Sequence, residues 1–335
     1  MIAPDMGLVE PFVRMLDDAA GPASVRAIEA GGTWQPLWQA IANSGYLDAL
    51  VSEDSGGAGL TLGQVAPLIE ALGAHALPLP VADTMVARAL LARAGIAAPA
   101  GPIALAASLA QPVTGALLAD HALVDTGTAL VLSPLVALNP QPTGVHGSSA
   151  AQLSGTPHGP VLDRPAGGLR ATAAVCRAAL IAGAVARLTT MTTGYANDRV
   201  QFGKPIGRQQ AVQHLLAVMA QDMIACRLAA RLGAAWGMPV PPLGAASAKI
   251  TTSIAAARVA NSAHAVHGAI GISADYDLQL LTRRLHEWRL ADGSEGYWSA
   301  VLGQARLGQA RLGQARLGND STTIEWVRSH IFRNM

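Results

Sequence analysis

The stretch Arg199-Val200-Gln201-Phe202-Gly203-Lys204-Pro205-Ile206-Gly207 separates two long helical patterns. Residues 178–197 before it are rich in Ala, Leu, Ile and Val, and apolar residues recur at helical spacing over residues 209–236 after it. Gly203, Pro205 and Gly207 predict a tight, stiff connection, because Gly tolerates unusual backbone angles and Pro fixes its own. A guanidinium beside amide side chains and a Gly-rich backbone is suited to hold a diphosphate. The pattern is equally typical of a plain helix hairpin with a solvated arginine.

Composition places few limits on function. The chain has 335 residues, 51% hydrophobic and 13% charged, which is enough for two or three domains with real cores. Its net charge of +1 gives no electrostatic case for binding nucleic acid or an anionic membrane surface.

Cysteine usage and the amino terminus favour a soluble cytoplasmic protein. Cys176 and Cys226 lie inside helical patterns and are expected to be buried thiols in a reducing compartment. The first residues contain no basic segment followed by an apolar run, so we expect no signal peptide. No apolar run reaches membrane-spanning length without Gly, Pro or a charge, so we expect no membrane span.

Changes in pattern divide the chain into four parts. Residues 1–98 are expected to form a helical amino-terminal domain and residues 169–303 a second helical domain. Between them, over residues 99–168, Pro, Gly, Thr and Val increase and short apolar runs alternate with turns, which predicts a small β barrel or sandwich. The expected strands are 103–107, 115–118, 122–125, 129–132 and 144–146.

Residues 304–335 form an extension and tail. The unit Leu-Gly-Gln-Ala-Arg occurs three times over residues 302–316, and a period of five is neither a heptad nor a helical stripe. We therefore interpret the repeat as a duplicated extension of the last helix, without chemistry. A short helix over residues 323–332 is expected to follow.

The order Arg-x-x-Phe-Gly-Lys-Pro-Ile, followed by Gln-Ala and a Met-containing helix, resembles the acyl-CoA dehydrogenase family. The resemblance implies a mainly α fold: an α-helical amino-terminal domain, a small β-barrel-like middle domain and a carboxy-terminal four-helix bundle. It implies FAD as cofactor and an arginine that reaches the pyrophosphate of the neighbouring subunit's FAD. The contacts that it implies for this chain are Arg199, Gln201, Phe202 and Gln210.

A second motif of the same kind follows the third helix of the carboxy-terminal domain. By resemblance, Val266, His267, Gly268 and Ala269 offer backbone groups to the cofactor of a partner subunit. The family often has Gln near position 265 and Gly at 269, where this chain has alanine. No carboxylate or cysteine lies at ligand spacing from the histidines here, so we predict no metal site.

A third motif concerns the catalytic base. The family's base is usually a Glu in a Glu-Gly-Thr turn, and ungapped counting places that turn at Asp292, Gly293 and Ser294. A carboxylate out of water has a raised pKa and becomes a competent base. A shift of three residues would make Glu295 the base instead, and both acids could also simply cap or solvate a turn. Gly293 is assigned to the substrate with Asp292.

Some family members draw their base from the first helix of this domain, but residues 170–174 contain no acid. That region usually helps to hold CoA, which makes Arg170 and Thr172 weak candidates for substrate contacts.

The largest departure from the family lies in the middle region. The family's Thr-Glu-Pro segment and Gly-Ser-Asp turn, which lie against the flavin, are not found in residues 99–168. Three functions therefore stay open. The chain is an FAD-dependent acyl-CoA dehydrogenase, a non-catalytic subunit that completes the flavin site of a hetero-oligomer, or a flavin oxidase or monooxygenase of the same fold. The expected partners are an acyl-CoA substrate, electron-transfer flavoprotein or a similar acceptor, and further copies of this chain or a second dehydrogenase-like chain.

Overall fold

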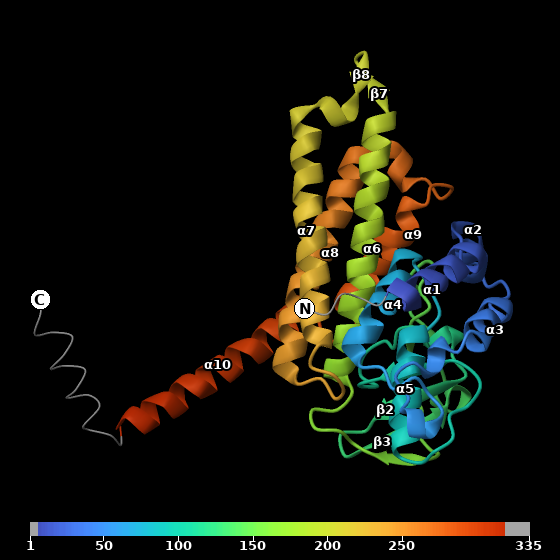
Figure 1. Cartoon of the computed structure of the whole chain (residues 1–335), viewed down its shortest axis with the longest axis vertical. Helices are drawn as coiled ribbons and strands as arrows, with labels where there is room; N and C mark the ends of the chain where they lie inside the picture. Colours follow the sequence, from blue (N-terminus) through green and yellow to red (C-terminus); the bar gives the residue numbers. More distant parts are fainter. Residues whose placement is uncertain (1–5, 319–335) are drawn as a thin grey trace, which may run out of the picture.

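The computed structural model describes residues 6–318, with side chains described from 7 to 307. Helices at the amino terminus lie beside a small sheet, and a long helical bundle rises from both (Figure 1). The expected mainly α fold is confirmed. The helices are α1 Met6–Ala19, α2 Pro22–Glu29, α3 Gln35–Asn43, α4 Leu62–Ala74, α5 Val81–Arg93, α6 Arg170–Asp198, α7 Gln210–Ala234, α8 Pro242–His267, α9 Leu278–Leu290 and α10 Glu295–Gly318.

The strands are short and lie in the middle of the chain and at one helix connection. They are β1 Ile103–Ala106, β2 His121–Asp125, β3 Ala129–Pro134, β4 Gln141–Pro142, β5 Ala151–Gln152, β6 Val161–Asp163, β7 Val200–Gln201 and β8 Lys204–Pro205.

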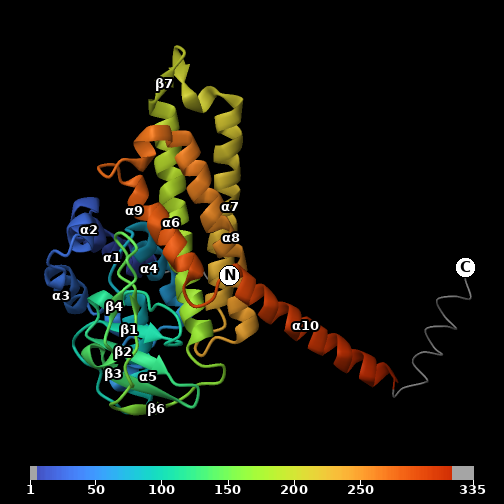
Figure 2. The ribbon, with the colours of Figure 1, turned by 180° about the vertical axis from the view of Figure 1, so that it is seen from behind.

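Four of these strands form the sheet of the middle region, in the order β1-β2-β3-β6 (Figure 2). β1 and β2 are parallel, and the other neighbours are antiparallel. In the part of the chain that the structure describes, β1 and β6 do not pair with each other. Consecutive residues in the middle of β2 and β3 are buried, so both faces of the sheet are covered by other parts of the chain.

Two of the expected strands are wrong. Residues 116–118 form a 3-10 turn after Gly115, whose φ of 75° ends the extended backbone. Residues 144–146 lie in a loop between β4 and β5, where Gly144 and Gly147 have positive φ. Short apolar runs carry too little periodic information to distinguish a strand from a turn.

The amino-terminal helices are set by local signals. Thr61 accepts a hydrogen bond from the Gln64 backbone, and the Gln64 side chain accepts one from Thr61 N–H, which is a complete capping box at the start of α4. α4 therefore begins directly after the Gly-rich turn of residues 51–60.

α6 is the central helix of the structure. It is long and apolar enough to cross a membrane, but 89% of its apolar window is buried inside the protein by other helices. α4 approaches it closely at two glycines: a Cβ at Gly73 would meet the carbonyl oxygen of Leu180, and one at Gly183 would meet that of Glu70. These contacts join the amino-terminal helices to the bundle without a gap.

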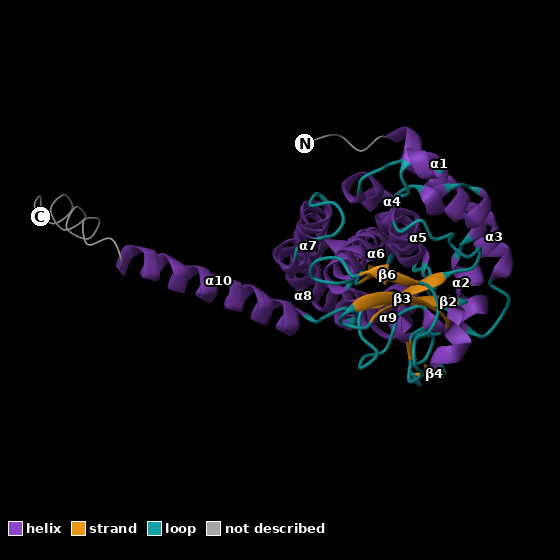
Figure 3. Cartoon of the chain, turned by 90° about the horizontal axis from the view of Figure 1, so that it is seen from below, coloured by secondary structure: helices purple, strands orange, loops and turns teal. Residues whose placement is uncertain are grey.

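α6, α7, α8 and α9 form the four-helix bundle, and α10 leaves it and projects away from the body (Figure 3). The five-residue repeat lies in α10, which runs without a break from Glu295 to Gly318. The repeat is therefore an extension of the last helix, as expected. The helix expected at 323–332 lies outside the described residues.

Candidate functional site

The signature stretch forms a β-hairpin at one end of the bundle. Arg199 ends α6, β7 pairs with β8, and Gln209 precedes the first turn of α7. Phe202 and Gly203 connect the two strands with φ angles of 53° and 76°. Two successive positive φ angles are what a two-residue type I′ hairpin turn requires. Glycine accepts this conformation freely, whereas it is uncommon for a residue with a bulky side chain.

This hairpin points its polar and aromatic groups outward. Phe202 is 91% exposed, Arg199 and Gln201 are exposed, and Arg199 has no ion-pair partner among the described residues. Gln210 follows on the first turn of α7 and is also exposed. The structure thus brings these four predicted cofactor residues together on a surface of the chain. The hairpin therefore exposes a cation without an ion-pair partner among the described residues, next to an exposed phenyl ring.

The second predicted motif lies at the same end of the bundle. Val266 shares a small hydrophobic cluster with Ile206 of the hairpin and Ala196 of α6. His267 stacks on Tyr195 with ring centroids 4.3 Å apart. Gly268 ends α8 with a φ of 61°. The two motifs, which lie more than fifty residues apart in the sequence, are therefore neighbours in the folded chain.

His267 is buried in this cluster. Its Nδ1 lies 2.8 Å from the carbonyl oxygen of Ala263, and its Nε2 has no hydrogen-bond partner in the described structure. Burial lowers the pKa of His267. Gly268 and the exposed Ala269 present backbone beyond the histidine, which fits the expected backbone contacts.

The predicted acid turn lies elsewhere, between α9 and α10. Asp292 has a φ of 56° and Gly293 one of 103°, so the chain reverses there in the left-handed region. Trp298 Nε1 donates to the Asp292 carbonyl oxygen at 3.1 Å. Lys249 Nζ donates to the carbonyl oxygens of Trp288 and Arg289 at 2.7 Å each, and so caps the end of α9.

The carboxylate of Asp292 belongs to a buried network of three charged side chains. Arg177 Nε donates to Asp292 Oδ2 at 3.0 Å, and Arg177 Nη2 donates to Asp83 Oδ2 at 2.7 Å. The three side chains are 3% (Arg177), 0% (Asp83) and 10% (Asp292) exposed. Two carboxylates therefore share one guanidinium away from water.

Burial and proximity change the proton affinities in this network. Burial raises the pKa of Asp83, and the Asp292 charge raises it further, against the lowering effect of Arg177. Although burial opposes it, the two carboxylates raise the pKa of Arg177. Burial lowers the pKa of Lys249, on the neighbouring α8, to about 7.

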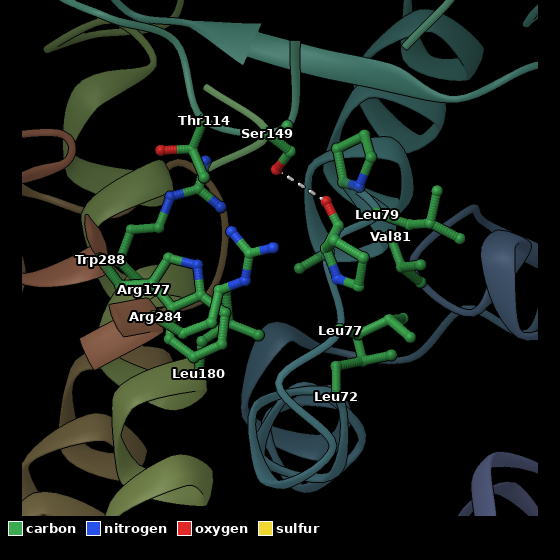
Figure 4. A pocket seen from close by; sticks show the side chains of 14 residues that line it. Leu72, Leu77, Leu79, Val81, Thr114, Ser149, Arg177, Leu180, Arg284 and Trp288 are labelled. Atoms are coloured by element: carbon green, nitrogen blue, oxygen red, sulfur yellow. Dashed lines mark hydrogen bonds between the residues drawn. The ribbon is translucent and has the colours of Figure 1, made fainter. Parts of the chain in front are cut away.

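Arg177 is sealed from solvent on its other side. It lines a small cavity together with Arg284, Thr114 and Ser149, and Ser149 Oγ closes that cavity by donating to the Pro78 carbonyl oxygen at 3.0 Å (Figure 4). All three parts of the fold therefore meet around this guanidinium.

Glu295, the alternative acid, has a different environment. It is 27% exposed, begins α10 and forms a two-fold hydrogen-bonded ion pair with Arg289. The hydrogen bonds from Arg289 hold the pKa of the Glu295 carboxyl below its usual value. Glu295 is thus ion-paired with a residue near the end of α9 and is partly exposed to solvent.

The loop after β1 separates two cavities next to the acid turn. An apolar cavity of about 460 Å³ lies between residues 111–114, residues 143–150 and α9, and ends at Ala291. A more polar cavity of about 570 Å³ lies on the other side, beside Arg164, Arg170 and Tyr297. Between them Asp292 and the loop enclose only about 10 Å³, which is about the space of one water.

The three predicted substrate residues lie in three different places. Arg170 lines the polar cavity, where its guanidinium lies 5.0 Å from the Tyr297 ring centroid and donates to Gln111 Oε1 at 3.3 Å. Thr172 is buried, and its hydroxyl accepts the Val240 N–H at 3.2 Å, away from both cavities. Gly293 packs against Trp298 and Tyr297, and a Cβ there would meet the Tyr297 ring at 2.5 Å.

Three residues of the acid site were missed in the sequence: Asp83, Arg177 and Lys249. A signal existed for two of them. Arg177 is the single charged residue between Ala171 and Ala186, and Lys249 is the single one between Pro242 and Ala257. A lone charge inside an otherwise apolar buried helix requires a partner, but the sequence does not say which.

Comparison with known proteins agrees with this architecture. Residues 170–328 match the family model described as "Acyl-CoA dehydrogenase, C-terminal domain". The acyl-CoA dehydrogenase IpdE2 of Mycobacterium tuberculosis is 32% identical over 291 residues, which cover 83% of this chain and 90% of the relative.

Solved structures share the fold. The ChsE4-ChsE5 complex from Mycobacterium tuberculosis contains a chain with a TM-score of 0.78 and 22% identity, covering 90% of this chain and 97% of that one. The Tcur3481-Tcur3483 steroid ACAD G363A variant gives a TM-score of 0.76 at 24% identity, covering 91% and 98%.

Proposed function

Because this chain belongs to the acyl-CoA dehydrogenase family of oxidoreductases that act on CH–CH bonds, we propose that it dehydrogenates an acyl-CoA thioester, with Asp292 as the base. Asp292 takes the proton from the α-carbon. When bound, FAD would supply the redox chemistry that removes the hydride from the β-carbon.

The burial of the Asp292 carboxylate carries this proposal. It is the acid that faces the loop of residues 105–114 between the two cavities, whereas Glu295 is held outside by Arg289. A base in a site that excludes water can meet the substrate proton directly, without solvent in between. This environment favours a catalytic chain over a subunit that only completes a partner's flavin site.

The two cavities suit the two halves of the substrate. The apolar cavity beside α9 has the size of a small-molecule site, and we assign it to the acyl group. The polar cavity contains Arg164 and Arg170, which can bind the phosphates of CoA through their guanidinium groups. The loop between the cavities must move aside for a thioester to reach Asp292.

We place the diphosphate of the cofactor at a subunit boundary, because the hairpin is exposed on the surface of this chain. Arg199, Gln201, Phe202 and Gln210 would hold the pyrophosphate side of FAD bound to a neighbouring chain, and the backbone of residues 266–269 would contact the same molecule. Arg177 lies 22 residues before Arg199, which is about 33 Å along a helix at 1.5 Å per residue. The hairpin of one chain is therefore remote from its own acid.

The neighbouring chain in this proposal is a second, related dehydrogenase chain. Both solved structures named above carry the names of two gene products, and Arg199 of the hairpin has no ion-pair partner among the described residues. Electron-transfer flavoprotein or a similar acceptor would reoxidise the reduced cofactor.

The test is a matched pair of carboxamide variants. Asp292→Asn should keep FAD and acyl-CoA binding and slow flavin reduction by about 10²–10⁴-fold, the usual cost of removing a general base. Glu295→Gln should reduce flavin at nearly the parent rate. Stopped-flow bleaching of flavin absorbance by an acyl-CoA measures both.

Reversed effects would make Glu295 the base. If both variants reduce flavin at the parent rate, the chain is the non-catalytic partner of a hetero-oligomer, and the proposal is wrong.

A further inference from the structure

We propose that Arg177 is a positioning residue for the Asp292 base and that Asp83 tunes this base by competing for the same guanidinium. This inference rests on the proposed role of Asp292. It adds two residues, from α6 and α5, to the machinery of the reaction.

The first argument is geometric. Arg177 contacts a single oxygen of Asp292, Oδ2, and the other oxygen, Oδ1, accepts no hydrogen bond within the described structure. A carboxylate fixed through one oxygen keeps the second oxygen available for a proton. The left-handed backbone at Asp292 and the bond from Trp298 to its carbonyl hold the turn that carries this carboxylate.

The second argument is electrostatic. An arginine next to an aspartate ordinarily lowers its pKa by about 1–3 units, which would weaken a base. Here Asp83 is bound to the same guanidinium at 2.7 Å and also accepts the Leu105 N–H at 3.2 Å. Because one cation is shared by two carboxylates, Arg177 cannot neutralise both, and Asp292 experiences only part of its charge.

The third argument comes from an unsatisfied atom. Asp83 Oδ1 is buried without any hydrogen-bond partner in the described structure. A buried carboxylate oxygen without a partner is costly to keep charged. When Asp292 accepts the substrate proton, Arg177 becomes free to pair fully with Asp83. Protonation of the base is thus coupled to better compensation of the second acid.

The other charged and titratable groups around Asp292 do not provide this coupling. Lys249 approaches from α8 but donates to the carbonyl oxygens that end α9, and Glu295 is paired with Arg289. Cys176, beside Arg177 on α6, is buried, and burial raises the pKa of its thiol to about 12. Asp83 is the acid that shares a hydrogen-bond donor with Asp292.

Asp83→Asn tests the competition. The amide keeps an oxygen for Arg177 and for the Leu105 N–H but removes the negative charge. The full charge of Arg177 then acts on Asp292. The acidic limb of the pH profile for flavin reduction should move at least one unit lower, and the maximal rate should fall about 10-fold, with the acyl-CoA KM unchanged.

A second readout does not depend on turnover. Infrared difference titration of the carboxylates, with Asp292→Asn to assign the band, should show the same downward shift in the unreacted oligomer. Asp222→Asn is the matched control, because Asp222 is a buried acid paired with the single arginine Arg258 in the bundle. It should leave the pH profile unchanged.

A double variant, Asp83→Asn with Arg177→Met, covers the case in which the single variant does not fold. It leaves no unpaired buried charge in the network except Asp292. The acidic limb should then move upward, opposite in sign to the single variant, and the maximal rate should fall because the carboxylate is no longer oriented.

An unchanged acidic limb in either folded variant would overturn the inference. The proposed function fails separately: it is wrong if Asp292→Asn reduces flavin at the parent rate, whatever the Asp83 variants do.

Discussion

The hairpin at residues 199–210 and the turn at Asp292 are the two chemically marked regions of the chain, and they are built in opposite ways. The hairpin is exposed, and its arginine and phenyl ring have no partners within the described structure. The acid turn is buried, and its carboxylate is bound by an arginine that is itself 3% exposed and bound to a second acid.

The two regions differ in whether the contacts that they need come from within the chain or from outside it. Local sequence is sufficient to form the hairpin, but its contacts must come from outside the chain. The acid turn is completed inside the chain, by residues from α5, α6 and α8. A mutation in the hairpin should therefore affect assembly and cofactor, while one in the network should affect folding and the base.

The largest effect that sharpens this comparison is expected for Arg177→Met. Removing the shared cation leaves Asp83 and Asp292 buried side by side, and breaking a buried ion pair in this way costs about 3–5 kcal/mol of unfolding free energy. Urea denaturation followed by circular dichroism measures the loss. Arg199→Met is the matched variant and should leave the denaturation midpoint unchanged; equal losses would remove the distinction.

The second effect is on the cofactor. Arg199→Ala should weaken flavin retention about 10- to 100-fold, as expected for loss of a charge-assisted hydrogen bond to a pyrophosphate, without changing the unfolding midpoint. Flavin fluorescence after ultrafiltration of the oligomer measures retention. Arg187→Ala, an exposed arginine on the same helix, is the control. Unchanged retention in Arg199→Ala would refute the hairpin's role.

The smallest effect is a pH dependence of stability at the buried end. The pKa of Lys249 falls from 10.5 to about 7 on folding. Between these values the unfolded chain binds more protons than the folded chain. Stability should therefore rise with pH in this window, by at most about 1.4 kcal/mol per unit from this residue.

Lys249→Met should remove that rise, so urea midpoints of parent and variant at pH 7, 8 and 9 should diverge steadily. Lys204→Met in the exposed hairpin serves as the control and should follow the parent. A parent and a Lys249→Met curve with the same slope would show that Lys249 stays charged against the carbonyl oxygens of α9.

The sequence alone determined the parts of the molecule that depend on short-range rules. Helical periodicity located α6, α7, α8 and α9, and the glycines and proline of residues 203–207 indicated the hairpin between two of them. The order of residues in the hairpin and in the 266–269 turn indicated the family. Periodicity and turn chemistry act over a few residues, which is why they can be recognised locally.

Tertiary structure decided how these parts are combined. Only the folded chain joins Val266 to Ile206, forms a 3-10 turn at residues 116–118 where a strand was expected, and places Thr172 against Val240 instead of in a cavity. It also distinguishes Asp292 from Glu295, which lie three residues apart and are equally acidic in the sequence. The environment of a charge is set by residues far away in the chain, here Asp83 and Arg177, because burial and pairing are long-range consequences of packing.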